Sequence, residues 1–252
     1  MNQLAKWMSA SLFTIVLVTS NSEASSRTTP WLYDTRTMTA GEVEYEQWTT
    51  WKTDKKSDSD FDEFRFRHEI EWGVTDQFQM AIYFADWRYT KTSTETKTLF
   101  HDVAVEAILQ LQAPTPDDVG VALYGEVKYG DDFVELEGKV LVEMELDQVN
   151  LLYNLTLEAE WEGESLDDDK GVIENAFAIT YQPDPTITYG VQALWEIEFP
   201  GWSSQNDDVI YVGPSIAWQS DGWWVTISPL FQATDVRTEP DMQIRFLFGI
   251  DF

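Results

Sequence analysis

The stretch FVELEGKVLVEMELDQVNLLYNLTLEAEWE (133–162) decides the fold class. Apolar residues alternate with polar ones through both of its halves, on either side of Asp147 and Gln148. Side chains two residues apart share one face of a β-strand, so each half is predicted to be a long strand with one apolar and one polar face. A helix would scatter the same charges around its whole circumference. The stretch is therefore predicted to be a hairpin that turns at residues 147–148.

The same alternation recurs along the chain and predicts about twelve strands. Most are longer than the roughly five or six residues usual in a soluble sheet, and they reach the roughly nine to eleven that cross a bilayer when tilted. The predicted strands are 41–51, 61–73, 77–88, 101–113, 119–129, 132–146, 149–162, 171–182, 186–198, 208–219, 222–234 and 241–252.

The connections between these segments alternate between short and long. Short turns are predicted at 73–76, 113–118, 147–148, 183–185 and 220–222, and longer polar links at 52–60, 89–98, 163–170, 200–208 and 234–240, with 129–132 as a short exception. Short periplasmic turns and longer outer loops characterise outer-membrane barrels. The sequence thus predicts an all-β fold, a transmembrane up-and-down antiparallel β-barrel of about 12 strands, whose last residue returns to the periplasmic side.

The N-terminal residues 1–24 are predicted to be a signal peptide. A single cation, Lys6, precedes an apolar stretch around Leu12 to Val18, and Ser22-Glu23-Ala24 has the small-x-small form of a cleavage site. The alternative, a membrane anchor, needs about twenty apolar residues. Residues 25–40 are then expected to form a periplasmic N-terminal lead-in, and residues 41–252 the barrel.

Composition narrows the class of protein further. The chain has no cysteine, so no disulfide framework is expected. Its 45 Asp and Glu outnumber 16 Lys and Arg and give a net charge of −29, which argues against a nucleic-acid partner, because phosphates demand cations. A barrel accommodates this polarity because only one face of each strand meets lipid.

Aromatic residues cluster where predicted strands meet loops, as expected of interfacial girdles. They are Trp48, Trp51, Trp87, Tyr89, Tyr129, Trp161, Trp195 and Phe199 near the outer ends, and Trp72, Tyr181, Trp218 and Trp223 near the inner ends. A soluble lipocalin-like barrel is the alternative, but it points its apolar face inward, and twelve long strands would enclose too wide a lumen for that face to fill.

The last ten residues, QIRFLFGIDF (243–252), have odd-numbered residues on the predicted lumen face and even-numbered ones on the lipid face. The segment resembles the C-terminal assembly signal of Gram-negative outer-membrane proteins, with Arg245, Ile250 and Phe252 in its polar, apolar and aromatic places. Leu247 stands where that signal usually has glycine, and Gly249 is displaced. The resemblance implies the barrel-assembly machinery as a partner.

The whole predicted mature chain also resembles uncharacterised outer-membrane barrels labelled putative transporters. The resemblance rests on YEQWTTWK (45–52), YGEVKYG (124–130), ELEGK (135–139), EAEWEG (158–163), GPSIAW (213–218) and the final FGIDF. It implies a barrel in the bacterial outer membrane and names no substrate.

Motifs for nucleotide, metalloprotease or serine-hydrolase chemistry are missing from the sequence. Of its two histidines, His68 carries lipid-face parity, as in the twelve-stranded outer-membrane phospholipase, but EIEWG (69–73) follows it in place of that family's Ser-Asn-Gly run. His101 opens a predicted strand. We therefore expect no catalytic residues, no cofactor and no enzymatic activity, with a lipid-modifying enzyme as a third alternative for the function.

The predicted lumen is acidic. A tight turn at 147–148 pairs Glu135 with Glu160 and Glu137 with Glu158, and Glu174 on the next strand is expected to approach Glu158. Like charges directly opposite destabilise a sheet, so the cluster forms either a hydrated wall or a cation-preferring channel or divalent-cation site. No resident metal is assigned. Basic residues are expected to pair with Glu63, Glu69 or Glu143; they are Arg65, Arg67, Lys128, Lys139 and Arg245.

Two functions follow from these patterns. The first is a passive channel or transporter with an acidic, cation-preferring lumen, which passes small cations or small solutes and contacts outer-membrane lipid. The alternative is a structural or assembly protein of the envelope with a plugged, non-conducting lumen.

Overall fold

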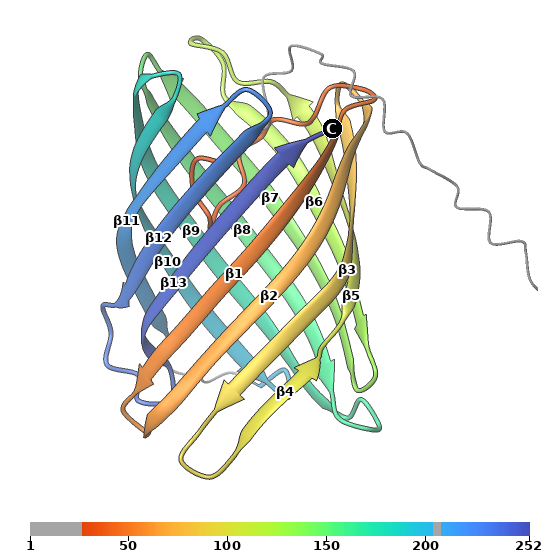
Figure 1. Ribbon diagram of the computed structural model, residues 1–252, viewed down its shortest axis with the longest axis vertical. Coiled ribbons are helices and arrows are strands. Elements are labelled where there is room, and N and C mark those ends of the chain that lie inside the picture. The colour runs from red at the N-terminus through yellow and green to blue at the C-terminus, as the bar shows by residue number, and fades with distance from the viewer. Residues whose placement is uncertain (1–26, 204–207) are drawn as a thin grey trace, which may run out of the picture.

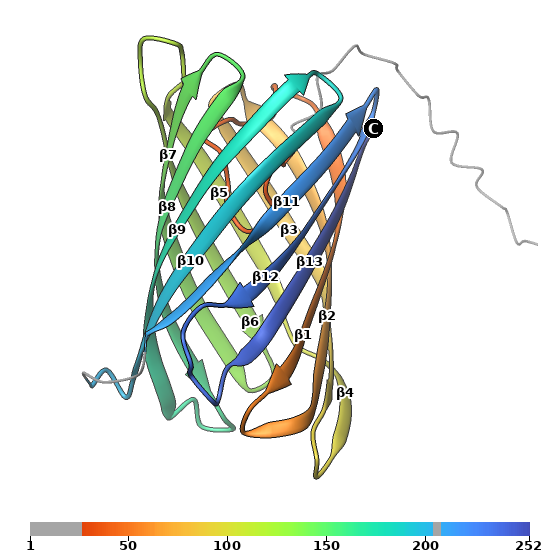
Figure 2. The same ribbon diagram turned by 90° about the vertical axis from the view of Figure 1, so that its left-hand side faces the viewer.

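The computed structural model describes residues 27–203 and 208–252, which form a closed antiparallel barrel (Figures 1 and 2). Each strand pairs with the next in sequence except that β4 and β5 both pair with β3, and β13 closes the ring by pairing with β1. The strands are β1 (Val43–Lys55), β2 (Asp58–Thr75), β3 (Phe78–Lys91), β4 (Thr96–Phe100), β5 (Val103–Gln112), β6 (Gly120–Gly130), β7 (Phe133–Leu146), β8 (Val149–Glu162), β9 (Asp168–Asp184), β10 (Ile187–Pro200), β11 (Val209–Ser220), β12 (Trp223–Gln232) and β13 (Pro240–Asp251). The predicted barrel is confirmed.

The strand predicted at 101–113 corresponds to β5, and a further strand, β4, forms just before it, mostly within the predicted link 89–98. β4 and β5 both pair with β3, β4 with its last five residues and β5 with Phe78–Tyr83, so the two pieces share one position in a twelve-stranded ring. Between them, the backbone amide of His101 donates to the carbonyl of Asp86, and the carboxylate of Asp102 accepts from the Arg65 guanidinium. Residues 101–102 leave the strand geometry at the point where Asp102 turns into the lumen.

Several predicted loops are shorter in the structure. Residues 52–60 continue β1 and β2 as a paired ladder, down to Lys55 opposite Asp58, and β9 begins at Asp168 within the predicted link 163–170. The polar ends of these strands remain paired because the hydrogen bonds between strands satisfy their backbone groups as well as water does. The predicted signal peptide, residues 1–24, lies outside the described residues.

Side chains on the outer surface are predominantly apolar. Val127, Ile179 and Val191 are each more than half exposed. On the opposite face of the same strands, polar and charged side chains such as Glu106 and Thr156 are buried. This arrangement inverts that of a soluble barrel and fits a surface that faces lipid.

Most aromatic residues expected at the interfaces lie on this outer face, but Trp48 does not. Its side chain is 5% exposed and lies inside the barrel, where its indole N–H donates to Glu46 at 2.7 Å. Trp48 follows Glu46 by two residues in β1, so its side chain points into the lumen like those of Glu44 and Glu46. The interface prediction neglected this alternation along the strand. No helix in the described part of the chain is long and apolar enough to cross a membrane.

The barrel has two distinct ends, for which we use fixed names. The tight-turn end carries the connections after β2, β5, β7, β9 and β11 together with the C-terminus, and is uppermost in Figure 1. The long-loop end carries the others. The segment before β1 enters the barrel from the tight-turn end in both views (Figures 1 and 2). Residues 27–40, here called the plug, therefore lie inside the barrel and, at their end, along its tight-turn rim, where Thr39 and Ala40 are exposed, so residues 27–38 do not form the separate periplasmic lead-in expected at 25–40.

Candidate functional site in the barrel lumen

The plug is held by polar side chains of the barrel wall. Both backbone groups of Tyr33 bond to Asn154 on β8, with N–H to Oδ1 at 2.8 Å and Nδ2–H to the carbonyl at 2.9 Å. Thr35 donates its amide and its hydroxyl to Glu143 Oε2. Arg36 forms ion pairs with Glu143, at 2.9 Å, and with Glu145. A segment without helix or sheet is thus satisfied inside the lumen by side chains, as buried backbone groups require.

Apolar contacts add to this hold. Leu32 is 2% exposed, and full burial of a leucine side chain is worth about 1.5–3 kcal/mol. It packs against wall residues of β8 to β12, namely Leu152, Ala176, Ala178, Leu194, Val209, Tyr211 and Leu230. Tyr33 lies in a second cluster with Trp48, Ile108, Ala122, Tyr124, Leu141, Trp224 and Leu247. Apolar contacts as well as polar ones therefore hold the plug across the lumen.

A cavity lies on each side of the plug. The first, here called the outer chamber, has a volume of about 350 Å³ and extends from Trp31, Tyr33 and Trp48 to charged residues at the long-loop end such as Glu198 and Glu239. The second has about 870 Å³ and lies at the tight-turn end, between Arg36 and Met38 of the plug and turn residues such as Asp184 and Asp221.

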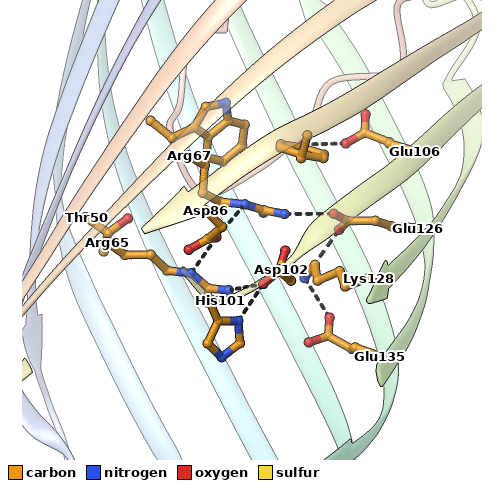
Figure 3. A network of polar contacts seen from close by, with 12 residues as sticks. Thr50, Arg65, Arg67, Asp86, His101, Asp102, Glu106, Glu126, Lys128 and Glu135 are labelled. Carbon is orange, nitrogen blue, oxygen red and sulfur yellow. Dashed lines mark hydrogen bonds and ion pairs between the residues drawn. The ribbon is translucent and has the colours of Figure 1, made fainter. Parts of the chain in front are cut away.

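The wall of the outer chamber carries a ladder of ion pairs that crosses several strands (Figure 3). Arg65 and Arg67 on β2 both contact Asp86 Oδ2, at 2.9 and 3.1 Å, and Arg67 reaches Glu126 Oε1 on β6 at 2.9 Å. Lys128, also on β6, then joins Glu126 at 3.3 Å and Glu135 at 2.6 Å. Each charge in this ladder has a partner on the same or a nearby strand.

The five acidic residues expected to form a lumen cluster all line the outer chamber. Glu135 lies opposite Glu160, and Glu137 opposite Glu158, in the β7–β8 register. Glu174 lies opposite Thr156 on β8 and opposite Glu196 on β10. One oxygen each from Glu135, Glu137 and Glu158 falls within 4.8 Å of the others.

The basic residues take different partners from those expected. Lys128 and Lys139 both contact Glu137, at 3.2 and 2.7 Å. Glu143 bonds to the plug, and among the described residues no ion pair of the ladder reaches Glu69. The prediction of pairs with Glu63, Glu69 or Glu143 was wrong because it considered the wall strands alone and omitted the plug and the inward Asp86 and Asp102.

The residues that resemble the assembly signal occupy three environments. The Arg245 guanidinium lies in the lumen, 3.6 Å from the centroid of the Trp31 ring, and donates to the carbonyl of Pro30 at 3.2 Å. Ile250 pairs with Tyr45 on β1, and Phe252 is exposed at the end of the strand. Arg245 therefore contacts the plug.

Gly249 has a steric reason to be glycine. A Cβ built on it would lie 2.2 Å from the indole nitrogen of Trp224, which in turn donates to Glu44 Oε2 at 2.8 Å. The glycine that is displaced from its usual place in the signal leaves room for this indole.

His68 lies on the outer face between strands. Its Nδ1 is 2.8 Å from the Tyr45 hydroxyl, and its ring stacks on Phe84. His101 contacts Asp102 through Nδ1 at 2.5 Å.

Sequence reasoning missed the plug and the wall residues that hold it. The signal was present, because Trp31, Leu32 and Tyr33 are three consecutive large apolar or aromatic residues in the segment predicted to be a periplasmic lead-in. Such residues seldom remain in water without a surface to cover.

The sequence profile of a family of unknown function, DUF6662, matches residues 28–152 and again residues 130–235. The chain belongs to this family. The match begins within the plug, so the family profile includes residues inside the barrel as well as its strands. No curated protein matches the chain significantly in sequence.

Solved structures with a similar fold include an outer membrane channel from Pseudomonas putida F1, with a TM-score of 0.63 and 11% identity over 88% of this chain and 99% of that one. The NanC porin has a TM-score of 0.52 and 11% identity over 82% of this chain and 98% of the porin. At such identity the likeness establishes the fold. With its apolar outer face, this family member is a β-barrel of the bacterial outer membrane.

Proposed function

We propose that the protein is a passive outer-membrane channel for small cations or small solutes. One observation carries the proposal: the lumen holds two cavities, of about 350 and 870 Å³, that are lined by polar residues and lie on either side of the plug. A lumen filled by wall side chains alone would need no such segment. The similar folds of an outer membrane channel and a porin support the same class of function.

A preference for cations follows from the lining of the outer chamber. Acidic residues outnumber basic ones there, and rings of carboxylates favour cations. The acidic side chains concentrate on β7 to β10, whereas Arg65, Arg67 and Arg88 lie on the β2 and β3 side. A permeating cation would therefore follow the β7–β10 wall.

The plug also favours a second candidate, a structural protein of the envelope whose lumen does not conduct. Planar-bilayer recording separates the two when the mature chain, refolded without lipopolysaccharide, is compared with a variant lacking residues 25–40. We expect current from the wild-type chain and a larger conductance without the plug. Failure of both proteins to conduct, with both barrels folded, would reject the channel and favour the structural role.

Cation preference has its own test. Replacement of Glu135, Glu137, Glu158 and Glu160 by Gln removes charge and keeps size, and reversal potentials in a salt gradient should shift toward lower cation selectivity. The matched control replaces four exposed acids outside both cavities, Asp117, Asp118, Asp131 and Asp132, by Asn. Equal shifts in both variants would mean that the chamber carboxylates do not set selectivity.

We also propose that the protein is not a lipid-modifying enzyme. The His68 ring nitrogen nearest to a partner is engaged by a tyrosine hydroxyl, which is no nucleophile of the serine type. Phospholipid hydrolysis by the refolded protein that disappears in His68→Phe would overturn this assignment.

We propose, finally, that the barrel-assembly machinery recognises the last strand. Phe252→Ala removes an exposed aromatic side chain without disturbing the lumen, so a lower yield of heat-modifiable barrel in outer membranes reports recognition rather than stability. Leu146→Ala, at another exposed strand end, is the control. An unchanged yield for Phe252→Ala would contradict the proposal.

A further inference from the structure

A second group of carboxylates lies deeper in the barrel than the outer chamber. Its members are 0 to 1% exposed and come from three strands on one side of the wall, β1, β2 and β5, with β3 between β2 and β5. We call it the buried acidic cluster: Glu44 and Glu46 on β1, Glu69 and Glu71 on β2, and Glu106 on β5. β1 and β2 bring Glu46 opposite Glu69 and Glu44 opposite Glu71.

This cluster has far less positive charge than carboxylate. Within the described residues, its ion pairs come from Arg27 alone, with Nε 3.1 Å from Glu46 Oε1 and Nη2 3.1 Å from Glu71 Oε1. Arg67, the next guanidinium along the wall, already contacts Asp86 and Glu126. Burial of several unpaired charges costs several kcal/mol each, so the cluster requires further positive charge, from cations or from protons.

Neutral donors satisfy some oxygens of the cluster. Trp224 donates to Glu44, Trp48 to Glu46, and Gln79 to Glu71, while the hydroxyls of Tyr83 and Tyr33 donate to Glu106 Oε2 at 2.6 and 3.1 Å. These donors hold the carboxylates in place, and other oxygens of the same carboxylates remain without a donor.

Four buried carboxylate oxygens of the cluster have no hydrogen-bond partner among the described residues: Glu44 Oε1, Glu106 Oε1 and the two of Glu69. Glu69, Glu71 and Glu106 each offer one oxygen within 4.8 Å of the other two. Ligand oxygens lie about 2.3–2.6 Å from Ca²⁺, so oxygens around one ion are at most about 5 Å apart. The spacing fits a single ion.

We propose that Glu69, Glu71 and Glu106 bind one hard divalent cation, for which calcium is the probe. All-carboxylate oxygen ligands suit this class of ion. Glu69 supplies both oxygens, and Glu106 supplies the oxygen opposite its tyrosine donors. Arg27 and Tyr33 of the plug contact Glu71 and Glu106 and so cover the site, and the ion itself bridges β2 and β5. The site does not depend on whether the barrel conducts.

The test measures calcium directly. Mature chain, refolded in detergent without lipopolysaccharide and stripped with chelator, is dialysed against CaCl₂, and bound metal is counted per barrel. We expect one ion, and terbium used as a luminescent substitute should be sensitised through the neighbouring Trp48. Absence of bound calcium at millimolar concentration would overturn the site and show that the cluster is neutralised by protons.

Two variants locate the ion. Glu69→Gln should weaken calcium binding at least about tenfold, since loss of even a supporting group costs about 10–100-fold in metal affinity. Glu126→Gln is the matched control, because Glu126 is equally buried but its oxygens are occupied by Arg67, Tyr124 and Lys128. Wild-type affinity in Glu69→Gln, or an equal loss in Glu126→Gln, would reject the assigned ligands. If Glu69→Gln fails to fold, calcium binding by Glu106→Gln and the number of ions bound per wild-type barrel test the assigned ligands instead.

Discussion

Two groups of buried carboxylates in this barrel receive their positive charge from different sources. Around Glu135 and Glu137 the cations are Lys128 and Lys139, which lie on the same neighbouring strands, β6 and β7. In the buried acidic cluster the cation comes from the plug, which joins the wall only after threading into the lumen.

The difference shows which carboxylates are neutralised by cations of the barrel wall and which depend on docking of the plug. Ion pairs between adjacent strands form together with the hairpins that carry them. Arg27 reaches Glu71 across 44 residues of sequence, so its pairs exist only while the plug is in place. The carboxylates of the outer chamber are therefore neutralised by cations of the wall itself. Those of the buried acidic cluster receive the charge of Arg27 only while the plug is docked.

The largest expected effect is that of Lys128→Met. The change leaves Glu126, Glu135 and Glu137 without a shared cation, and breaking a buried ion pair from one side costs about 3–5 kcal/mol. The free energy of unfolding of the refolded barrel in denaturant should fall by this amount. Lys97→Met, which removes an exposed cation, should leave it unchanged. A small loss for Lys128→Met would mean that the chamber wall is not intrinsically neutralised.

Arg27→Met should release the plug more than it unfolds the barrel. The strands keep their ladders, so the unfolding midpoint should move less than in Lys128→Met, while trypsin cleavage after Arg36 becomes faster. Arg237→Met, in an exposed loop, is the control. A plug that stays protected in Arg27→Met would show that docking does not depend on this charge.

Tyr83→Phe should have an intermediate effect. It deletes a fully buried hydroxyl that donates to Glu106 at 2.6 Å, and a hydrogen bond to a charged group contributes about 1.5–3 kcal/mol. Chemical denaturation should show this loss, and Tyr129→Phe on the outer face should show none. Equal stability of Tyr83→Phe and wild type would argue that Glu106 is satisfied otherwise.

The smallest effect is expected from Glu145→Gln. This residue contacts Arg36 at the tight-turn end, where both side chains are partly exposed, and exposed ion pairs contribute about 0–1 kcal/mol. Both the unfolding free energy and the trypsin cleavage rate should stay near wild type. If Glu145→Gln lowers stability and protection from trypsin as much as Arg27→Met does, the plug is held mainly at the tight-turn end of the barrel.

Much of the barrel follows from the sequence by itself. Alternation in segments such as 133–162 is a local property, because the pleat sends successive side chains to opposite faces whatever their neighbours are. Strand number, strand order, the register of the β7–β8 hairpin and the inward direction of Arg245 and Leu247 follow from this period and from short turns. The outward apolar face then indicates the membrane.

Only the tertiary structure decided what fills the lumen. Parity states that Glu69 points inward, but its neighbours Glu106 and Arg27 lie 37 and 42 positions away in the chain and meet it only when the sheet closes and the plug enters. The plug has no period that could reveal it, because its backbone bonds to wall side chains such as Asn154 and Glu143 and not to a strand. Contacts that depend on closure of a ring are set by three-dimensional distance, which an alternating pattern in one dimension does not contain.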